Sequence, residues 1–168
     1  MNPSDVIKRT FIFDDLDEQE VLNVLKITKE RHFSKDEVIM QEGQEGDSMY
    51  IIVDGSVEIS KTLTMKTGED DFAEREKILT SFRSADNVVF GEIAMIDREK
   101  RSASVIATSD CVFLEIERED FLGLIEQRPQ MGVKVLKKIA ELLASRLRQS
   151  SQDVIRLTTA LSIALSSS

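Results

Sequence analysis

The residues best suited to chemistry lie within residues 90–103, where Gly91 and Glu92 come shortly before Arg101. Gly91 allows the backbone to approach a bound group closely. The first N–H groups of a short helix over 92–96 would offer an anion site. The guanidinium of Arg101 would present a planar set of donors to the same anion, and the carboxylate of Glu92 suits a pair of hydroxyls. One acceptor, one cation and several backbone amides together predict a site for a sugar-phosphate.

Other kinds of site are poorly supported by the composition. The chain contains one histidine, His32, and one cysteine, Cys111, whereas zinc and iron sites usually need several imidazoles or thiolates. The same scarcity removes most nucleophile–histidine arrangements, so we expect no metal and no enzyme. The alternative explanation of Glu92 and Arg101 is a surface ion pair between them, which is common and contributes little stability.

The charge balance bears on the partners. With 22 basic and 31 acidic residues, the chain has a formal net charge of −9. Phosphate is therefore repelled over most of the surface, and we expect no DNA binding and no membrane association. No run approaches the length of about 18 apolar residues that a membrane span needs, and the N-terminus lacks a secretory pattern. Together with the single cysteine, this predicts a cytoplasmic protein.

The chain divides into three parts, and the first two must position the candidate site. Residues 1–32 form an N-terminal helical segment, in which one apolar stripe predicts helix over 4–31 and Asp17 with Glu20 resembles a capping box. Residues 33–117 alternate short β-type runs with glycine turns, which indicates a small antiparallel barrel or sandwich. The expected strands are 38–40, 49–53, 56–60, 76–82, 103–107 and 111–116.

Two turns stand out among these strands. Asp54–Gly55 predicts a tight hairpin, because both residues tolerate positive φ. The polar stretch 66–71 predicts a solvated hairpin tip.

The third part, residues 118–168, returns to helix. We expect a helix over 118–127, a break at Arg128–Pro129 and a long helix over 131–165. A seam of residues at alternating steps of four and three runs along it: Leu136, Ala140, Leu143, Leu147, Ser150, Val154, Leu157, Leu161 and Ala164. Such a seam predicts a homodimer through the C-terminal helix. The alternative is a helix that lies on its own barrel, although about 30 residues exceed the length that a small barrel covers.

Two motifs in this sequence resemble the cyclic nucleotide-binding domain family, of the catabolite activator and protein kinase A regulatory subunit types. Phe90-Gly91-Glu92-Ile93-Ala94-Met95, followed by Arg101-Ser102-Ala103, is similar to its phosphate-binding cassette. Residues 39–57 are similar to its early strands, with three turn glycines in place. The resemblance covers about residues 10–165. It implies a mainly β fold, an antiparallel β-barrel (double-stranded β-helix, jelly roll), with N-terminal helices and a long C-terminal helix.

The resemblance also implies a role for each cassette residue. Glu92 would accept from the ribose 2′-hydroxyl, and Gly91 would contact the ribose through its backbone. Arg101 would hold the cyclic phosphate, helped by backbone N–H groups near Ala94 and Ser102. The implied ligand-binding residues of the cassette are Gly91, Glu92, Ile93, Ala94, Arg101, Ser102 and Ala103.

Recognition of the base is implied less directly. In the family, Thr after the arginine favours cGMP and Ala favours cAMP, so Ser102 is intermediate; we expect cAMP ahead of cGMP. Catabolite activator-type proteins carry a Thr-Ser pair on the long helix that contacts adenine, one residue from each subunit. Ser150 and Ser151 stand at the similar place here. The alternative for Ser150 is a polar seam residue that sets the helix register or is merely tolerated.

Two departures from the family pattern matter. We expect no helix-turn-helix domain after the long helix, since the sequence to Ser168 leaves no room for one. The usual Gly-Asp before the cassette is replaced by residues 84–87, so that Asp86 or Asn87 must supply the positive φ of that turn.

These features predict a stand-alone cyclic nucleotide sensor that dimerises through its C-terminal helix and passes its signal to a downstream protein. The ligand would favour a state in which the long helix packs over it. The alternative is a ligand-independent interaction or scaffold domain of the same fold. The presence of both Glu92 and Arg101 weighs against that alternative, because a buried arginine without an anion carries a large desolvation cost.

Overall fold

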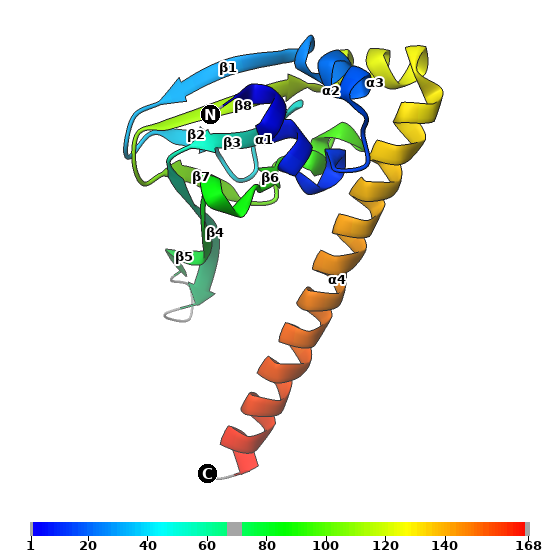
Figure 1. The fold of residues 1–168 in the computed structure, drawn as a ribbon. Helices are drawn as coiled ribbons and strands as arrows, with labels where there is room; N and C mark the ends of the chain where they lie inside the picture. The colour runs from blue at the N-terminus through cyan, green and yellow to red at the C-terminus, as the bar shows by residue number, and fades with distance from the viewer. Residues whose placement is uncertain (1, 67–71, 167–168) are drawn as a thin grey trace.

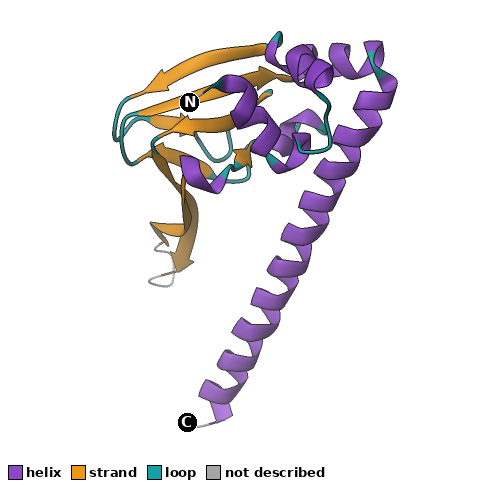
Figure 2. Cartoon of the chain, in the orientation of Figure 1, coloured by secondary structure: helices purple, strands orange, loops and turns teal. Residues whose placement is uncertain are grey.

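Two four-stranded antiparallel sheets with helices at both ends of the chain make up the fold (Figures 1 and 2). The computed structural model describes residues 2–66 and 72–166. One sheet has the order β1 (Thr28–Phe33), β8 (Cys111–Glu117), β3 (Ser48–Asp54), β6 (Val89–Phe90). The other has the order β2 (Val38–Met40), β7 (Ser104–Ala107), β4 (Ser56–Lys66), β5 (Phe72–Arg83). This is the expected jelly-roll fold, with one correction: the two sheets do not close into a barrel.

Strand β3 illustrates how the core is divided. Its residues alternate between the two faces of the first sheet, as the period of a strand requires. Met49 and Ile51 join an apolar cluster beneath the helices. Tyr50 and Ile52 join a second cluster between the two sheets. The interior cluster is aromatic, since Tyr50 stacks on Phe90 with ring centroids 5.8 Å apart.

The N-terminal segment differs from the prediction of one helix over 4–31. It consists of α1 (Pro3–Arg9), the short 3-10 helix η1 (Phe11–Phe13) and α2 (Glu18–Leu25), followed by β1. The predicted capping box is confirmed, because the side chain of Asp17 accepts from the N–H of Glu20 and the reverse bond is also present. The strand was missed because its partner is far away in sequence: Thr28 to Phe33 pair with β8. Long-range pairing of this kind overrides local preference.

The turn at Asp54–Gly55 is not the predicted hairpin. Gly55 does adopt a positive φ of 94°, but β3 and β4 on either side of it belong to different sheets. The turn therefore forms a corner between the sheets. The hairpin in this region joins β4 to β5, and residues 67–71 of the predicted tip at 66–71 lie outside the described residues.

The C-terminal part consists of α3 (Arg118–Gln127) and α4 (Pro129–Ser166), which confirms the break at Arg128–Pro129. The first turns of α4 bury Met131, Val135 and Ile139 in the cluster beneath the helices. Farther along, the helix extends away from the sheets (Figure 1). Within residues 2–66 and 72–166, no helix is both long and apolar enough to cross a membrane.

Candidate functional site

The backbone around Gly91 brings a buried carboxylate to the surface of a cavity. Strand β6 ends at Phe90, Gly91 follows with φ of 79°, and the 3-10 helix η3 (Glu92–Met95) begins at once. A Cβ on Gly91 would lie 2.8 Å from the backbone oxygen of Ser48 and 2.8 Å from Nη1 of Arg101. Only glycine fits this close approach without strain.

Glu92 is fully buried although it carries a carboxylate. Its Oε1 accepts a hydrogen bond from Nη1 of Arg146, which comes from α4. Its Oε2 finds no hydrogen-bond partner in the described part of the chain. Burial raises the pKa of Glu92 above its ordinary value, although the positive charges of Arg146 and Arg101 oppose this shift. The site therefore holds an acceptor with one free oxygen.

Arg101 lies in the turn before β7, three residues ahead of the first residue of that strand. Its backbone is held on both sides: its N–H donates to the carbonyl of Gln44 at 2.8 Å, and its carbonyl accepts from Gly43 at 2.9 Å. Its Nη2 donates to Oγ of Ser48 at 3.2 Å. Its Nη1 is buried and has no partner among the described residues. Burial lowers the pKa of Arg101 below its ordinary value.

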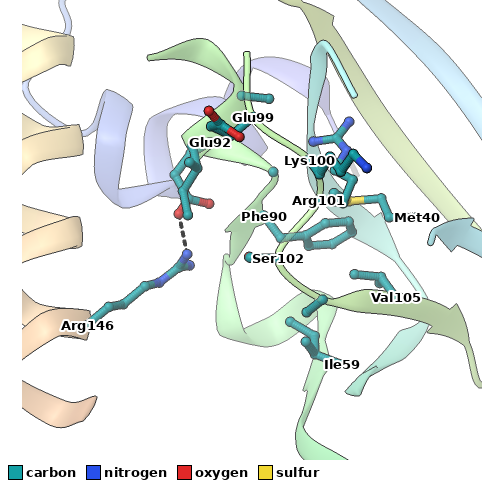
Figure 3. A pocket seen from close by; sticks show the side chains of 14 residues that line it. Met40, Ile59, Phe90, Glu92, Glu99, Lys100, Arg101, Ser102, Val105 and Arg146 are labelled. Atoms are coloured by element: carbon teal, nitrogen blue, oxygen red, sulfur yellow. Dashed lines mark hydrogen bonds and ion pairs between the residues drawn. The ribbon is translucent and has the colours of Figure 1, made fainter. Parts of the chain in front are cut away.

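The alternative explanation, a surface ion pair between Glu92 and Arg101, is wrong about both the pairing and the surface position. Glu92 pairs with Arg146 instead of Arg101, and neither Glu92 nor Arg101 is exposed on the surface. Figure 3 shows the contact between Glu92 and Arg146, with Arg101 on the far side of the pocket beside Met40. Each charge thus keeps a buried polar atom that an ion pair between the two would have satisfied.

A cavity of about 120 Å³ joins these groups (Figure 3). The predicted residues in its lining are Gly91, Glu92, Ile93, Ala94, Arg101, Ser102 and Ala103. The lining residues outside the predicted ligand-binding set are Met40, Ile59, Phe90, Glu99, Lys100, Val105 and Arg146. Ligand pockets usually begin near about 300 Å³, so the cavity of one chain is smaller than a typical pocket for a small molecule.

Arg146 is the most informative of the residues that were missed. Helical spacing continues the buried stripe of α4 from Ile139 to the half-buried Leu142 and then to Arg146. The stripe therefore ends in a cation, on the face that turns toward the sheets. That periodicity is present in the sequence, although the predicted heptad seam runs along a different face of the helix.

Three further expectations concern the serine pair, the backbone N–H of Ala94 and the turn before the cassette. Ser150 and Ser151 are exposed and do not line the cavity of the chain that carries them; Oγ of Ser151 donates to the carbonyl of Leu147. The N–H of Ala94 is not free, because it donates to the carbonyl of Gly91 at 3.1 Å. Asn87 does supply the turn before the cassette, with φ of 51°.

The chain is similar in sequence to a known domain family and to several known proteins. Residues 30–128 match the cyclic nucleotide-binding domain. The chain is 26% identical over 167 residues to a cAMP-dependent protein kinase regulatory subunit of Candida albicans, covering 89% of this chain and 33% of that protein. It is 32% identical over 158 residues to a cGMP-dependent protein kinase of Plasmodium berghei, covering 87% and 16%.

The solved structures agree with this match. The catabolite activator protein of Thermus thermophilus superposes with a TM-score of 0.74 and 29% identity, over 89% of this chain and 63% of that chain. The chain therefore spans less than two thirds of the length of each of these three proteins.

Proposed function

Because the chain belongs to the cyclic nucleotide-binding domain family, we propose that it binds a cyclic nucleotide in this cavity, cAMP ahead of cGMP. The observation that carries the proposal is a pair of unsatisfied buried atoms on one cavity. Glu92 Oε2 and Arg101 Nη1 both lack a partner among the residues described. An unsatisfied buried polar group costs about 1–3 kcal/mol, and more when it is charged. A ribose fused to a cyclic phosphate offers a hydroxyl donor and an anionic oxygen on one rigid frame.

The proposed contacts follow from the chemistry of the lining. Glu92 accepts from the ribose hydroxyl, and Nη1 of Arg101 donates to the phosphate in a charge-assisted hydrogen bond. Met40, Ile59 and Val105 offer apolar surface to the rest of the ligand. Among the described residues of the lining, Ser102 alone supplies a hydroxyl. If the phosphate takes that hydroxyl, no second hydroxyl of the lining remains for a guanine edge, which is the reason for placing cAMP first.

The helix α4 is the proposed responding element. It reaches the site through Arg146, whose Nη1 contacts Glu92 and whose Nη2 donates to the carbonyl of Val89. A ligand hydroxyl at Glu92 competes with or rearranges this contact, so that binding biases the position of the helix. The signal then passes to a downstream protein.

Dimerisation through α4 is also proposed. The seam residues Leu147, Val154, Leu157 and Leu161 are all more than half exposed, and the helix carries them away from its own sheets (Figure 2). Apolar residues at heptad spacing bury this surface most simply against the same seam of a second copy. The second copy would also bring a second Ser150–Ser151 pair toward the open side of the cavity.

A ligand-independent interaction domain is the second candidate, and one observation favours it. Arg146 on α4 pairs with Oε1 of Glu92, as expected of a domain in which this carboxylate fixes the helix in place of binding a ligand. In that case, the buried Nη1 of Arg101, which has no partner among the described residues, would lower the stability of the domain with no compensating function.

Thermal unfolding with cAMP, cGMP and 5′-AMP tests the two candidates. A ligand that binds only the folded protein adds about 2.7 kcal/mol of stability at 100 times its Kd. Arg101→Ala is expected to remain folded and to lose the response to both cyclic nucleotides. Arg9→Ala, which removes an exposed arginine of α1, is the matched control and should respond like the unmodified protein. No shift with either cyclic nucleotide at millimolar concentration would leave only the interaction domain.

A further inference from the structure

Glu115 is a buried carboxylate that the proposed contacts do not use. It lies on β8 with its side chain 7% exposed. Its side chain reaches the hydroxyl of Tyr50, whose ring belongs to the aromatic cluster between the two sheets. Burial of a charged group in this position costs folding free energy unless the group is paired and hydrogen-bonded. The partners of Glu115 must therefore offset that cost.

The hydrogen bonds of Glu115 lead to the candidate phosphate-binding arginine. Nη2 of Arg101 donates to Oγ of Ser48 at 3.2 Å, and that hydroxyl donates to the hydroxyl of Tyr50 at 3.3 Å. The hydroxyl of Tyr50 donates to Oε1 of Glu115 at 2.7 Å. Each hydroxyl accepts on one side and donates on the other. The chain of donors therefore runs in one direction, from a cation to an anion, and such chains polarise and strengthen each bond.

The other oxygen of Glu115 is anchored from outside. Oε2 accepts from Nε of Arg31 on β1 at 2.6 Å, and the side chain of Arg31 is half exposed. Burial alone would raise the pKa of Glu115, but the hydrogen bonds from Arg31 and Tyr50 lower it below the ordinary value. Glu115 is therefore ionised at neutral pH, as a counter-charge for Arg101 must be.

The two intervening hydroxyls determine what this counter-charge does. A carboxylate in direct contact with Arg101 would occupy its donors and exclude a phosphate. At the end of a chain through Ser48 and Tyr50, the negative charge compensates the guanidinium and fixes Nη2, while Nη1 stays free. A donor fixed before the ligand arrives loses less entropy on binding.

We propose that Glu115 is a positioning residue for Arg101: through Tyr50 and Ser48, it orients the guanidinium so that one terminal nitrogen faces the phosphate. This inference rests on the proposed function. A purely structural role would confine Glu115 to the bond with Arg31, which joins β1 to β8. Tyr50→Phe separates these roles, because it removes the hydroxyl that accepts from Ser48 and donates to Glu115, keeps the ring in the cluster and leaves the bond to Arg31 in place.

The experiment measures binding of the Rp and Sp phosphorothioate diastereomers of cAMP, which differ in the phosphate oxygen that sulfur replaces. The ratio of their two Kd values reports how Arg101 meets the phosphate. In Tyr50→Phe and Glu115→Gln, this ratio should change by roughly 2- to 10-fold, as expected for loss of one hydrogen bond. Phe113→Leu is the matched control, because Phe113 packs edge-on against Tyr50 in the same cluster and forms no part of the chain. It should lower stability without changing the ratio.

Coupling to Arg101 completes the test. In an Arg101→Lys background, Tyr50→Phe should leave the ratio unchanged, because there is no guanidinium to orient. If Glu115→Gln does not fold, Tyr50→Phe and the double variant still decide the question. If the ratio of the two Kd values is unchanged in Tyr50→Phe, or changes only as much as in Phe113→Leu, the positioning role of Glu115 is overturned. The proposed function is not affected by that outcome. Failure of the unmodified protein to bind either diastereomer or cAMP overturns the proposed function, and this inference with it.

Discussion

The cavity has a cassette side, which is buried and tightly held, and a helix side formed by α4, which is largely exposed. On the cassette side, Gly91 is closely surrounded, Glu92 is fully buried, and the backbone of Arg101 is fixed by two hydrogen bonds. On the helix side, α4 contributes Arg146 alone to the lining, and its side chain is 44% exposed. Ser150 and Ser151 lie one turn farther along and are exposed.

This difference bears on two parts of the proposed ligand, the sugar-phosphate and the base. The acceptor and the cation that suit a sugar-phosphate lie on η3 and on the turn before β7, both within one chain. The side chains proposed for the base are on an element that leaves the domain and exposes its apolar seam. Under the proposed function, recognition of the phosphate therefore rests on the folded domain, whereas recognition of the base depends on where α4 is held. Each prediction below tests one side of this comparison.

The largest effect is expected on the helix side, at the proposed dimer seam. Leu157→Glu should dissociate the dimer. Burying a leucine is worth about 1.5–3 kcal/mol, and two copies are lost per dimer, so the dissociation constant should rise by at least roughly 100-fold. Ile155→Glu is the matched control, since Ile155 is equally exposed (64% against 66%) but lies off the seam. Sedimentation velocity measures both variants. If both dissociate equally, the seam is not the interface.

The next effect tests whether the cassette side is preformed. Gly91→Ala should cost about 1–3 kcal/mol of unfolding free energy, because it combines a left-handed backbone with a Cβ against the oxygen of Ser48. Gly43→Ala is the control, since Gly43 has the same φ of +79° but open space around it. Urea unfolding should show the smaller loss there, and only Gly91→Ala should also weaken nucleotide binding. Equal losses with unchanged affinity would mean that the cassette is loosely packed.

The contact between the two sides, Glu92 with Arg146, gives a pH dependence. Because burial raises the pKa of Glu92 above 4.5, the stability that its proton contributes is present at low pH and is lost as the pH rises through the raised pKa. Binding has the opposite sign, since the ribose needs the ionised acceptor. Affinity should fall by up to about tenfold per pH unit below a midpoint that lies above 4.5.

Two variants assign this pH dependence. Arg146→Met removes the charge that favours ionisation and should move the midpoint to higher pH. Glu92→Gln should remove the dependence, apart from any titration of the nucleotide itself. Calorimetric titration across the range measures all three proteins. If the midpoint of affinity against pH is the same in both variants as in the unmodified protein, a group other than Glu92 is responsible for the titration.

What the sequence predicted well is local. Glu92 and Arg101 fall on one cavity because a short segment with a glycine turn leaves few ways to arrange them. Asn87 adopts a positive φ because short polar side chains tolerate it. The break before Pro129 follows from the steric limits of proline.

What the sequence did not predict depends on contacts across long separations. Residues 28–33 form a strand only because β8 pairs with them. Gly55 makes a corner because the strands on either side find partners in different sheets. Arg146 meets Glu92 only after α4 has packed on the cluster beneath the helices. None of these pairings is encoded in the local pattern that identified the cassette.

The smallest effect tests the base-reading role on the helix side. Ser150→Ala and Ser151→Ala should each change the ratio of cAMP to cGMP affinity by roughly 2- to 10-fold, the range of one neutral hydrogen bond. The ratio between the phosphorothioate diastereomers should stay unchanged, because Arg101 and Glu92 are untouched. Ser162→Ala, on the same helix but farther from the domain, is the control. Since the two serines do not line the cavity of the chain that carries them, their effect should disappear in Leu157→Glu. Loss of the effect in the monomer would assign base recognition to the second copy; persistence of the effect would assign it to the same chain and so break the division between the two sides.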